Sequence, residues 1–440
     1  MNSISFCITT SKNEKYYTFD LLKSLEKHTD FNKHEVLILI DSDNQNTYED
    51  LLKYKKDKPN IRVYKNQSGF PIGYQRNISI LFDKASHDIV MYLQADMIVG
   101  PDFDKYFLEA LDNNPKRIIS AARIEPPLHP ASPEKIIKNF GLNPEEFNFE
   151  AFCDFARDLQ KENRPLVYGY FAPFGLYKDS YFKYMGGFDS QFRCSREDSD
   201  FIIRLHNNLD ALQSWNACVY HYSCVSSRGD EWYKQTLLSD IKNEWQSKAD
   251  QEELKRFIRK WGYFGHDYKP KYQTTLVLDI NTAPNLSFLN QIEPYFDKIV
   301  LNEKPVLKEL ASLAVFESHY FANKRWGYTP NYWDEVKHKF MGPDLKEKFI
   351  HINDYSFDDN IIIKTDLYSL HKNFQSEEVQ QFIQNYNLMF YNLLNSSPES
   401  YVGKYQMNCF EVKINKLIDS NQTHLNAQQY IFDTSEFIFN

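Results

Sequence analysis

Short β-rich runs and amphipathic stretches alternate along the first part of the chain. The runs that suit buried strands cover residues 4–10, 35–40, 61–65 and 88–94. Apolar side chains at helical spacing mark residues 14–29, 47–56, 73–85 and 101–115 as helices. This close alternation of β and α segments predicts an α/β fold, in which helices cover both faces of a mostly parallel sheet.

The pattern changes after the first four strands and then starts again. Residues 126–165 hold many prolines and a charged helix, which indicates an insertion over the sheet. Short strands and turns are expected over 166–225, followed by one long helix over 231–261. The Gly-, Pro- and Tyr-rich segment 262–272 is typical of a domain boundary.

A second β/α pattern begins beyond this segment. Strands are predicted at residues 274–280, 298–302 and 360–367, and helices at 287–296, 303–315 and 376–395. We therefore expect two domains, residues 1–265 and a smaller α/β accessory domain at residues 270–440. The sequence leaves the role of the second domain open, with acceptor binding and homo-oligomerisation as alternatives.

Composition narrows the class of protein. The formal net charge of -9 gives no support to long-range attraction toward nucleic acid or an anionic membrane. The six cysteines are scattered without C-x-x-C spacing, so we expect neither a zinc site nor disulfides. No apolar run approaches the ~20 residues of a transmembrane helix, and the N-terminus lacks a signal-peptide pattern. A cytoplasmic location is expected, with peripheral attachment to a membrane as the alternative.

Polar clusters follow three of the predicted strands. They are Thr9-Thr10-Ser11, the segment from Asp41 to Asp43, and Gln94-Ala95-Asp96. In open α/β sheets, ligands bind outside the carboxyl ends of the strands. These clusters therefore predict a binding site at one edge of the sheet. Asp96 suits a metal ligand there, although a carboxylate at a strand end also caps the following turn.

A second constellation of polar residues lies further along the chain. Gly186-Gly187 permits a tight turn, and Glu197-Asp198 then opens a stretch with helical spacing of apolar residues. Carboxylates are favoured in the first turn of a helix by its dipole, which is the structural interpretation. The functional interpretation is a carboxylate that takes a proton from an acceptor hydroxyl.

Taken together, these motifs resemble the family 2 inverting glycosyltransferases of the GT-A fold. The resemblance covers about residues 3–225 and rests on motifs in the family's order: ISFCITTSKNE, LILIDSDN, NQSGFPIGYQRNISI, LQADMIVGPDF, and GGFD followed by EDSDFIIRL. It implies a Rossmann-like mixed sheet that binds a nucleotide-diphosphate sugar, with a UDP-sugar as the expected donor.

The resemblance also implies roles for individual residues. Asp198, beside Glu197, matches the general base of the family. Asp41 matches the acidic residue that contacts the nucleotide base, and Arg76 and Asn77 fall where the family contacts the nucleotide and diphosphate. The remaining nucleotide contacts are expected from Thr9, Thr10, Ser11, Gln94 and Ala95.

The expected metal site departs from the family pattern. Gln94 replaces the first acid of the D-x-D motif, and an amide is a poor ligand for a hard cation. Binding of Mn²⁺ or Mg²⁺ would then rest on Asp96 and on His221, since some relatives return a histidine to the metal from this region. The alternative for His221 is a half-buried histidine in a polar turn.

Acceptor and activity leave alternatives open. A glycan is the expected acceptor, a hydroxymethylated DNA base is the first alternative, and a protein side chain is the second. A non-catalytic nucleotide- or partner-binding module is the competing class, because of Gln94. Aromatic residues that precede GGFD can stack on a sugar or belong to the core, as can Trp215 and Trp232; they are Tyr168, Tyr170, Phe171, Phe174 and Tyr177.

Overall fold

The computed structural model describes most of the chain in separate ranges. These are residues 2–67, 73–129, 131–169, 172–189, 192, 196–223, 225, 254–265, 268–279, 292–302, 348–396, 403–419 and 437–439. The chain divides into two compact units, one formed by Met1–Lys242 with Ala427–Asn440 and the other by Asn243–Asn426. Several predicted segments fall outside the described ranges, among them most of the helix at 231–261 and the whole helix at 303–315.

The elements of the first unit follow the predicted order closely. Its strands are β1 (Ile4–Thr10), β2 (Glu35–Ile40), β3 (Ile61–Asn66), β4 (Ile89–Gln94), β5 (Met97–Val99), β6 (Arg117–Glu125), β7 (Lys135–Ile137), β8 (Val167–Tyr168), β9 (Phe174–Tyr177), β10 (Asp210–His221) and β17 (Phe437–Phe439). Its helices are α1 (Lys15–His28), α2 (Thr47–Tyr54), α3 (Tyr74–Lys84), α4 (Phe103–Leu111), α5 (Phe149–Lys161), α6 (Lys178–Lys183) and α7 (Glu197–Asn208), with 3-10 turns η1 (Phe31–Lys33) and η2 (Lys55–Asp57).

The strands of the first unit join in one mixed sheet, in the order β17-β3-β2-β1-β4-β9-β6-β10-β5, with β7 beside β6 and β8 beside β10. Strands β3, β2, β1 and β4 are parallel, and β6 pairs with β10 in parallel. β9 runs antiparallel between β4 and β6. The α/β prediction is confirmed, and so are the first four strands and the helices between them.

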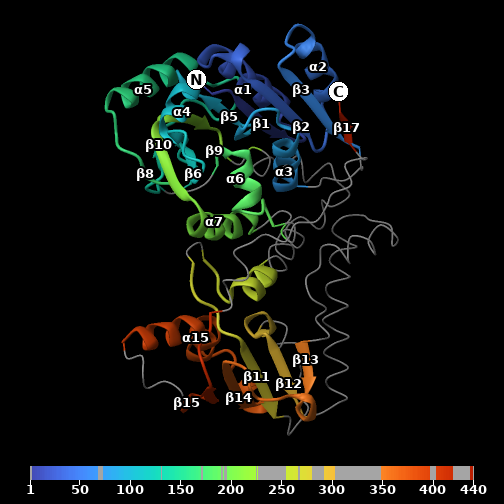
Figure 1. Cartoon of the computed structure of the whole chain (residues 1–440), viewed down its shortest axis with the longest axis vertical. Coiled ribbons are helices and arrows are strands. Elements are labelled where there is room, and N and C mark those ends of the chain that lie inside the picture. The colour runs from blue at the N-terminus through green and yellow to red at the C-terminus, as the bar shows by residue number, and fades with distance from the viewer. Residues whose placement is uncertain are drawn as a thin grey trace. The chain divides into compact units, whose positions relative to one another are not determined.

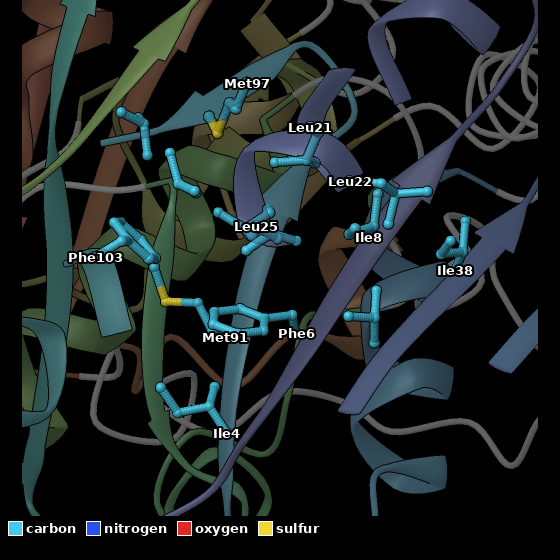
Figure 2. Close-up of a cluster of buried hydrophobic side chains, with 14 of the residues drawn as sticks. Ile4, Phe6, Ile8, Leu21, Leu22, Leu25, Ile38, Met91, Met97 and Phe103 are labelled. Atoms are coloured by element: carbon cyan, nitrogen blue, oxygen red, sulfur yellow. The ribbon is translucent and has the colours of Figure 1, made fainter. Parts of the chain in front are cut away.

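Helices cover both faces of this sheet, so its central strands are buried on both sides and largely apolar. Alternate side chains of β1 enter different cores: Phe6 packs on the side of α1, α2 and α4, while Cys7 packs on the side of α3, α6 and α7. Figure 2 shows Phe6, Met91 and Phe103 converging in the first of these cores. Burial on two faces explains why β1, β2 and β4 appear as continuous apolar runs.

The order of the parallel strands places the candidate site. The chain runs outward from β1 to β2 and β3, and then returns to the other side of β1 with β4. The carboxyl ends of β1 and β4 thus flank the point where the strand order reverses, and a crevice forms at such a point in open α/β sheets. Two of the three predicted polar clusters lie there.

The C-terminal strand belongs to the first sheet. β17 pairs antiparallel with β3, and Phe437 lies opposite Asn66; in Figure 1 it is the red strand beside the blue β3. From the sequence, these residues are predicted to belong to the second domain, 270–440. Pairing across such a distance along the chain satisfies the backbone groups of the exposed edge of β3, and local sequence patterns do not reveal it.

The second unit has its own mixed sheet, in the order β13-β12-β11-β14-β16-β15. Its elements are β11 (Thr274–Asp279), η5 (Glu293–Tyr295), β12 (Lys298–Leu301), β13 (Phe349–His351), η7 (Ile352–Asp354), β14 (Ile361–Asp366), α14 (Leu367–Asn373), α15 (Glu377–Ser396), β15 (Gly403–Met407) and β16 (Phe410–Ile414). β13, β12, β11 and β14 are parallel. Side chains of α14 and α15 pack against this sheet in a separate core. The predicted α/β character of the second domain is confirmed.

A buried histidine makes the first unit sensitive to acid. His28 is 7% exposed, stacks on Phe149, and lies with Nε2 3.3 Å from Cys153 Sγ. Burial, reinforced by the charges of Lys27 and Arg157, lowers the pKa of His28 to about 4. The unfolded chain, with a pKa near 6.5, binds the proton more readily. The first unit should therefore lose about 3 kcal/mol of stability between pH 6.5 and pH 4.

This loss can be separated from general acid denaturation with His28→Gln. Urea unfolding read by hydrogen exchange in first-unit peptides, at steps between pH 7 and pH 4, should give a shallower pH dependence for the variant than for wild type. Parallel curves for the two proteins would show that His28 does not carry the effect.

Candidate active site

Polar side chains lie side by side at the carboxyl ends of β1 and β4, where the binding site is predicted. Thr9 is the register partner of Gln94. Tyr92, also on β4, is buried, and burial, the largest influence, raises the pKa of its hydroxyl. Ala95 is buried directly after β4, and the backbone N–H of Ser11 donates to Glu14 Oε2 at 2.7 Å. The two strand ends thus form one polar surface.

Asp41 connects β2 to the start of α3. Its backbone N–H donates to Thr10 O at 2.9 Å. Asn66 Nδ2 donates to Asp41 Oδ1 at 3.0 Å, and the Gly73 N–H donates to Oδ2 at 3.0 Å. Gly73 has φ +90°, a conformation that suits glycine. Asp41 therefore connects the end of β2 to Asn66 on β3 and to Gly73 at the start of α3, a structural role that was not predicted for it.

The first turn of α3 carries the predicted nucleotide contacts. Arg76 and Asn77 are 6% and 1% exposed. Among the described residues, Asn77 Oδ1 is buried without a hydrogen-bond partner. The neighbouring Gln75 donates from Nε2 to Phe192 O at 2.6 Å, which ties α3 to the segment that leads into α7.

The structure brings Asp96 and His221 together from distant parts of the sequence. The end of β10 pairs with β5, so that His221 lies opposite Met97 and the Tyr222 N–H donates to Asp96 O at 3.0 Å. His221 Nε2 then lies 3.5 Å from Asp96 Oδ1. Burial by itself would raise the Asp96 pKa, but the charge and hydrogen bond of His221 hold it below its ordinary value.

Glu125 is a third member of this cluster, and the sequence analysis missed it. Its Oε1 lies 2.8 Å from His221 Nδ1, and its Oε2 accepts from Lys135 Nζ at 2.9 Å. Burial would raise the Glu125 pKa, yet the His221 hydrogen bond and the Arg123 charge lower it to about 2. The available signal was its place after the apolar run of 118–124, at a strand end like that of Asp96.

The two carboxylates also act on the histidine. Burial would lower the His221 pKa, but the charges and hydrogen bonds of Asp96 and Glu125 raise it to about 9. In the absence of another cation, His221 is therefore protonated at neutral pH. Among the described residues, no group of three His, Cys, Asp or Glu side chains has the arrangement of a metal site.

The predicted general base lies at the start of α7. Glu197 is 6% exposed, and Asp198 is half-buried. Asp198 Oδ1 accepts from the Ser199 N–H at 2.6 Å, which fixes one carboxylate oxygen. Arg196 precedes them with φ +66°, in the left-handed region, so the chain turns sharply into the helix.

A buried ion pair holds this helix against the GGFD turn. Arg204 and Asp200 have fully buried side chains, and Arg204 Nε donates to Asp200 Oδ2 at 2.9 Å. Arg204 Nη1 also donates to Met185 O at 2.5 Å and to Gly187 O at 2.7 Å. Within EDSDFIIRL, Asp200 and Arg204 thus stabilise the packing of α7 against this turn, besides the chemistry predicted for Asp198.

The predicted site residues fall into three groups in the structure. Contacts join the ends of β1, β2 and β4 with the start of α3, and a separate cluster joins Asp96 to His221. Glu197 and Asp198 form the third group, at α7. The aromatic residues differ among themselves: Tyr168 is 64% exposed and stacks on His206, whereas Phe174 and Trp215 are buried. Tyr170, Phe171 and Trp232 lie outside the described residues.

Comparison with known families identifies this domain. Residues 6–183 match the family model of Glycosyl transferase family 2. The chain therefore carries a glycosyl transferase family 2 domain over these residues. The match contains the ends of β1, β2 and β4 and the start of α3. It ends before Glu197, Asp198 and His221, so their roles stay predictions.

Solved structures show weaker similarity, and no curated protein matches the chain. GalNAc-T7 with UDP, GalNAc and Mn²⁺ has 15% identity and a TM-score of 0.37, over 50% of this chain and 43% of that one. TarS of S. aureus has 15% identity and a TM-score of 0.37, over 59% and 44%. The mannosyltransferase PcManGT from Pyrobaculum calidifontis, with GDP-Man and Mn²⁺, has 14% and 0.36, over 50% and 56%.

These similarities are too low to support an argument about substrates. The chain also spans less than half of the first two proteins. None of the helices in the described part combines the length and the apolar character that a bilayer crossing needs.

Proposed function

We propose that the first unit transfers a sugar from a UDP-sugar to a hydroxyl of a glycan, with inversion at the anomeric carbon. The observation that carries the proposal is the approach of His221 to Asp96, beside strand ends that belong to a glycosyl transferase family 2 domain. A nitrogen and an oxygen ligand at this edge suit the cation that a nucleoside diphosphate brings.

The residues present fit a divalent metal that is shared with the donor. Asp96 offers a carboxylate oxygen and His221 an imidazole nitrogen, at 3.5 Å from each other. Two protein ligands leave positions for diphosphate oxygens and water, as in sites that bind a metal together with a phosphate. When bound, Mn²⁺ or Mg²⁺ would act as a Lewis acid that neutralises charge on the leaving diphosphate.

The chain's own side chains would hold the rest of the donor. Arg76 and the N-terminus of α3 supply positive charge for the diphosphate. The buried Asn77 Oδ1 can accept a hydrogen bond from a donor hydroxyl. Asp41 would contact the nucleotide base, and the Gln94 amide a ribose hydroxyl. The remaining contacts would come from Thr9, Thr10, Ser11 and Ala95.

Asp198 would act on the acceptor. Its carboxylate takes the proton of the acceptor hydroxyl, and the oxygen then attacks the anomeric carbon from the face opposite the diphosphate. The bond between that carbon and the diphosphate oxygen breaks, and UDP leaves with the electron pair. One displacement of this kind inverts the configuration, and it requires only one carboxylate as the base.

A donor panel tests the proposal directly. UDP-, GDP- and CDP-sugars are offered with Mn²⁺ or with EDTA, and release of the nucleoside diphosphate is measured. UDP release that requires Mn²⁺ is the expected result. Turnover with GDP- or CDP-sugars alone would mean that the donor is not a UDP-sugar. Binding of UDP without turnover of any donor would favour the non-catalytic module. Transfer onto hydroxymethylated DNA but not onto glycans would mean that the acceptor is a DNA base and not a glycan.

Asp96→Asn tests the metal within this function. We expect Mn²⁺-dependent UDP release to fall by at least ~100-fold, because Lewis-acid stabilisation contributes several kcal/mol. Asp158→Asn is the matched control, since Asp158 lies on α5 in an exposed pair with Lys161. Equal rates for the two variants would exclude Asp96 as a metal ligand.

A further inference from the structure

Glu125 and His221 lie next to each other because of the register of two strands. β6 and β10 pair in parallel, with Ile124 opposite Tyr220, so the final residues of both strands are neighbours. Glu125 is 2% exposed, and its Oε1 lies 2.8 Å from His221 Nδ1. Ser223 Oγ lies near the same nitrogen at the longer distance of 3.4 Å.

The Glu125 carboxylate is itself held from two further directions. Lys135 Nζ donates to Oε2 at 2.9 Å, from β7, which pairs with β6. Arg123 Nη1 lies 3.5 Å from Oε1 and reaches Glu134 with its other terminal nitrogen at 3.3 Å. A carboxylate that is buried and ion-paired in this way keeps one orientation, so the imidazole that it contacts is also oriented.

This orientation determines which imidazole nitrogen is available. Both neighbouring carboxylates only accept hydrogen bonds, but Glu125 Oε1 lies 2.8 Å from Nδ1, whereas Asp96 Oδ1 lies 3.5 Å from Nε2. When the ring loses a proton, Nδ1 therefore keeps the one that the closer carboxylate accepts, and the lone pair of Nε2 becomes available on the Asp96 side. Metal-ligating histidines commonly donate their second N–H to a carboxylate, which fixes both the tautomer and the ring orientation.

We propose that Glu125 is the positioning residue of this site, which orients His221 so that its Nε2 and the Asp96 carboxylate converge on one divalent cation. The inference rests on the proposed function, because that function assigns Asp96 and His221 to the metal. Glu125 itself stays on the Nδ1 side of the ring and does not contact the cation.

Glu125→Gln tests the inference with the side-chain length unchanged. The amide loses the ionic acceptor, and its NH₂ group favours the opposite tautomer. Mn²⁺ affinity is measured from the free-ion EPR signal at a fixed UDP concentration, with a blank of UDP and Mn²⁺ without protein. We expect affinity to fall by ~10–100-fold, the range found for second partners of metal-bound histidines. His221→Ala should lose at least as much.

Glu134→Gln is the matched control. Glu134 belongs to the same ion-pair network through Arg123 but does not contact His221, and we expect its Mn²⁺ affinity to equal that of wild type. Histidine-selective ¹⁵N NMR above pH 9 gives a second readout without metal. The His221 signal, identified by its loss in His221→Ala, should show the proton on Nδ1 in wild type and move toward the other tautomer in Glu125→Gln.

The outcomes separate this inference from the function on which it rests. Wild-type protein that binds no Mn²⁺ with UDP overturns the metal assignment, and the inference fails with it. Wild-type binding, together with an affinity and a tautomer in Glu125→Gln that equal those of Glu134→Gln, overturns the inference alone. Thermal unfolding and circular dichroism of each variant show whether a loss of Mn²⁺ affinity reflects a loss of fold. A folded Glu125→Gln variant that binds Mn²⁺ weakly supports the inference.

Discussion

Replacing Asp198 with asparagine is expected to lower the kcat for sugar transfer by ~1,000-fold, while UDP binds as it does to wild type. A positioned general base contributes ~10²–10⁴-fold to a reaction of this kind, and asparagine cannot accept the proton. Asp198 is half-buried at the start of α7, and one of its oxygens already accepts from the Ser199 N–H. The other oxygen is the one proposed to face the acceptor.

Steady-state kinetics and UDP affinity, measured together, distinguish a lost base from a damaged site. A lost base lowers kcat with little change in UDP affinity, whereas a displaced helix weakens both. Asp158→Asn controls for the substitution itself, and Glu197→Gln for the neighbouring carboxylate. If Glu197→Gln loses more activity than Asp198→Asn, the base is Glu197 and the assignment to Asp198 is wrong.

Replacing Arg204 with methionine is expected to destabilise the first unit by ~3–5 kcal/mol, the cost of breaking a buried ion pair by removing one partner. Both side chains are fully buried, and Arg204 also donates to the carbonyls of Met185 and Gly187, at the GGFD turn. Methionine fills much of the volume but leaves the Asp200 carboxylate without its cation. Activity should fall as well, because Asp198 lies on the same helix.

Urea unfolding followed by hydrogen exchange in first-unit peptides measures this loss without interference from the second unit. The double variant Asp200→Asn with Arg204→Met should be more stable than Arg204→Met alone, since it leaves no buried charge behind. A loss below about 1 kcal/mol in Arg204→Met would mean that α7 and the turn are held by apolar packing, such as the stacking of Phe201 on Phe188.

Local patterns predicted much of the fold because the central strands are buried on both faces. An apolar run such as 35–40 has few alternatives to a buried strand, and the helices beside it have clear amphipathic spacing. The same apolar runs predicted the positions of Thr9, Asp41, Gln94 and Asp96. A polar residue that ends a buried strand lies at the end of the sheet where ligands bind.

Other parts of the site were not predictable in this way. No strand was predicted for the residues of β6, so Glu125 could not be recognised as a residue at the end of a strand near the site. β17 joins the sheet from the far end of the chain. The anchoring of α7 by Arg204 was hidden too. Its other partners, besides Asp200 on the same helix, are the backbone carbonyls of Met185 and Gly187, and carbonyls leave no trace in side-chain identity.

The sequence by itself determined the α/β class, the order of the main elements and the strand ends that carry polar residues, because each depends on the burial of neighbouring residues. Only the tertiary structure decided which of those ends meet. The pairing of β10 with β5 and β6 places His221 between Asp96 and Glu125. Register between strands that are distant in sequence depends on the packing of the whole sheet, and no local pattern encodes it.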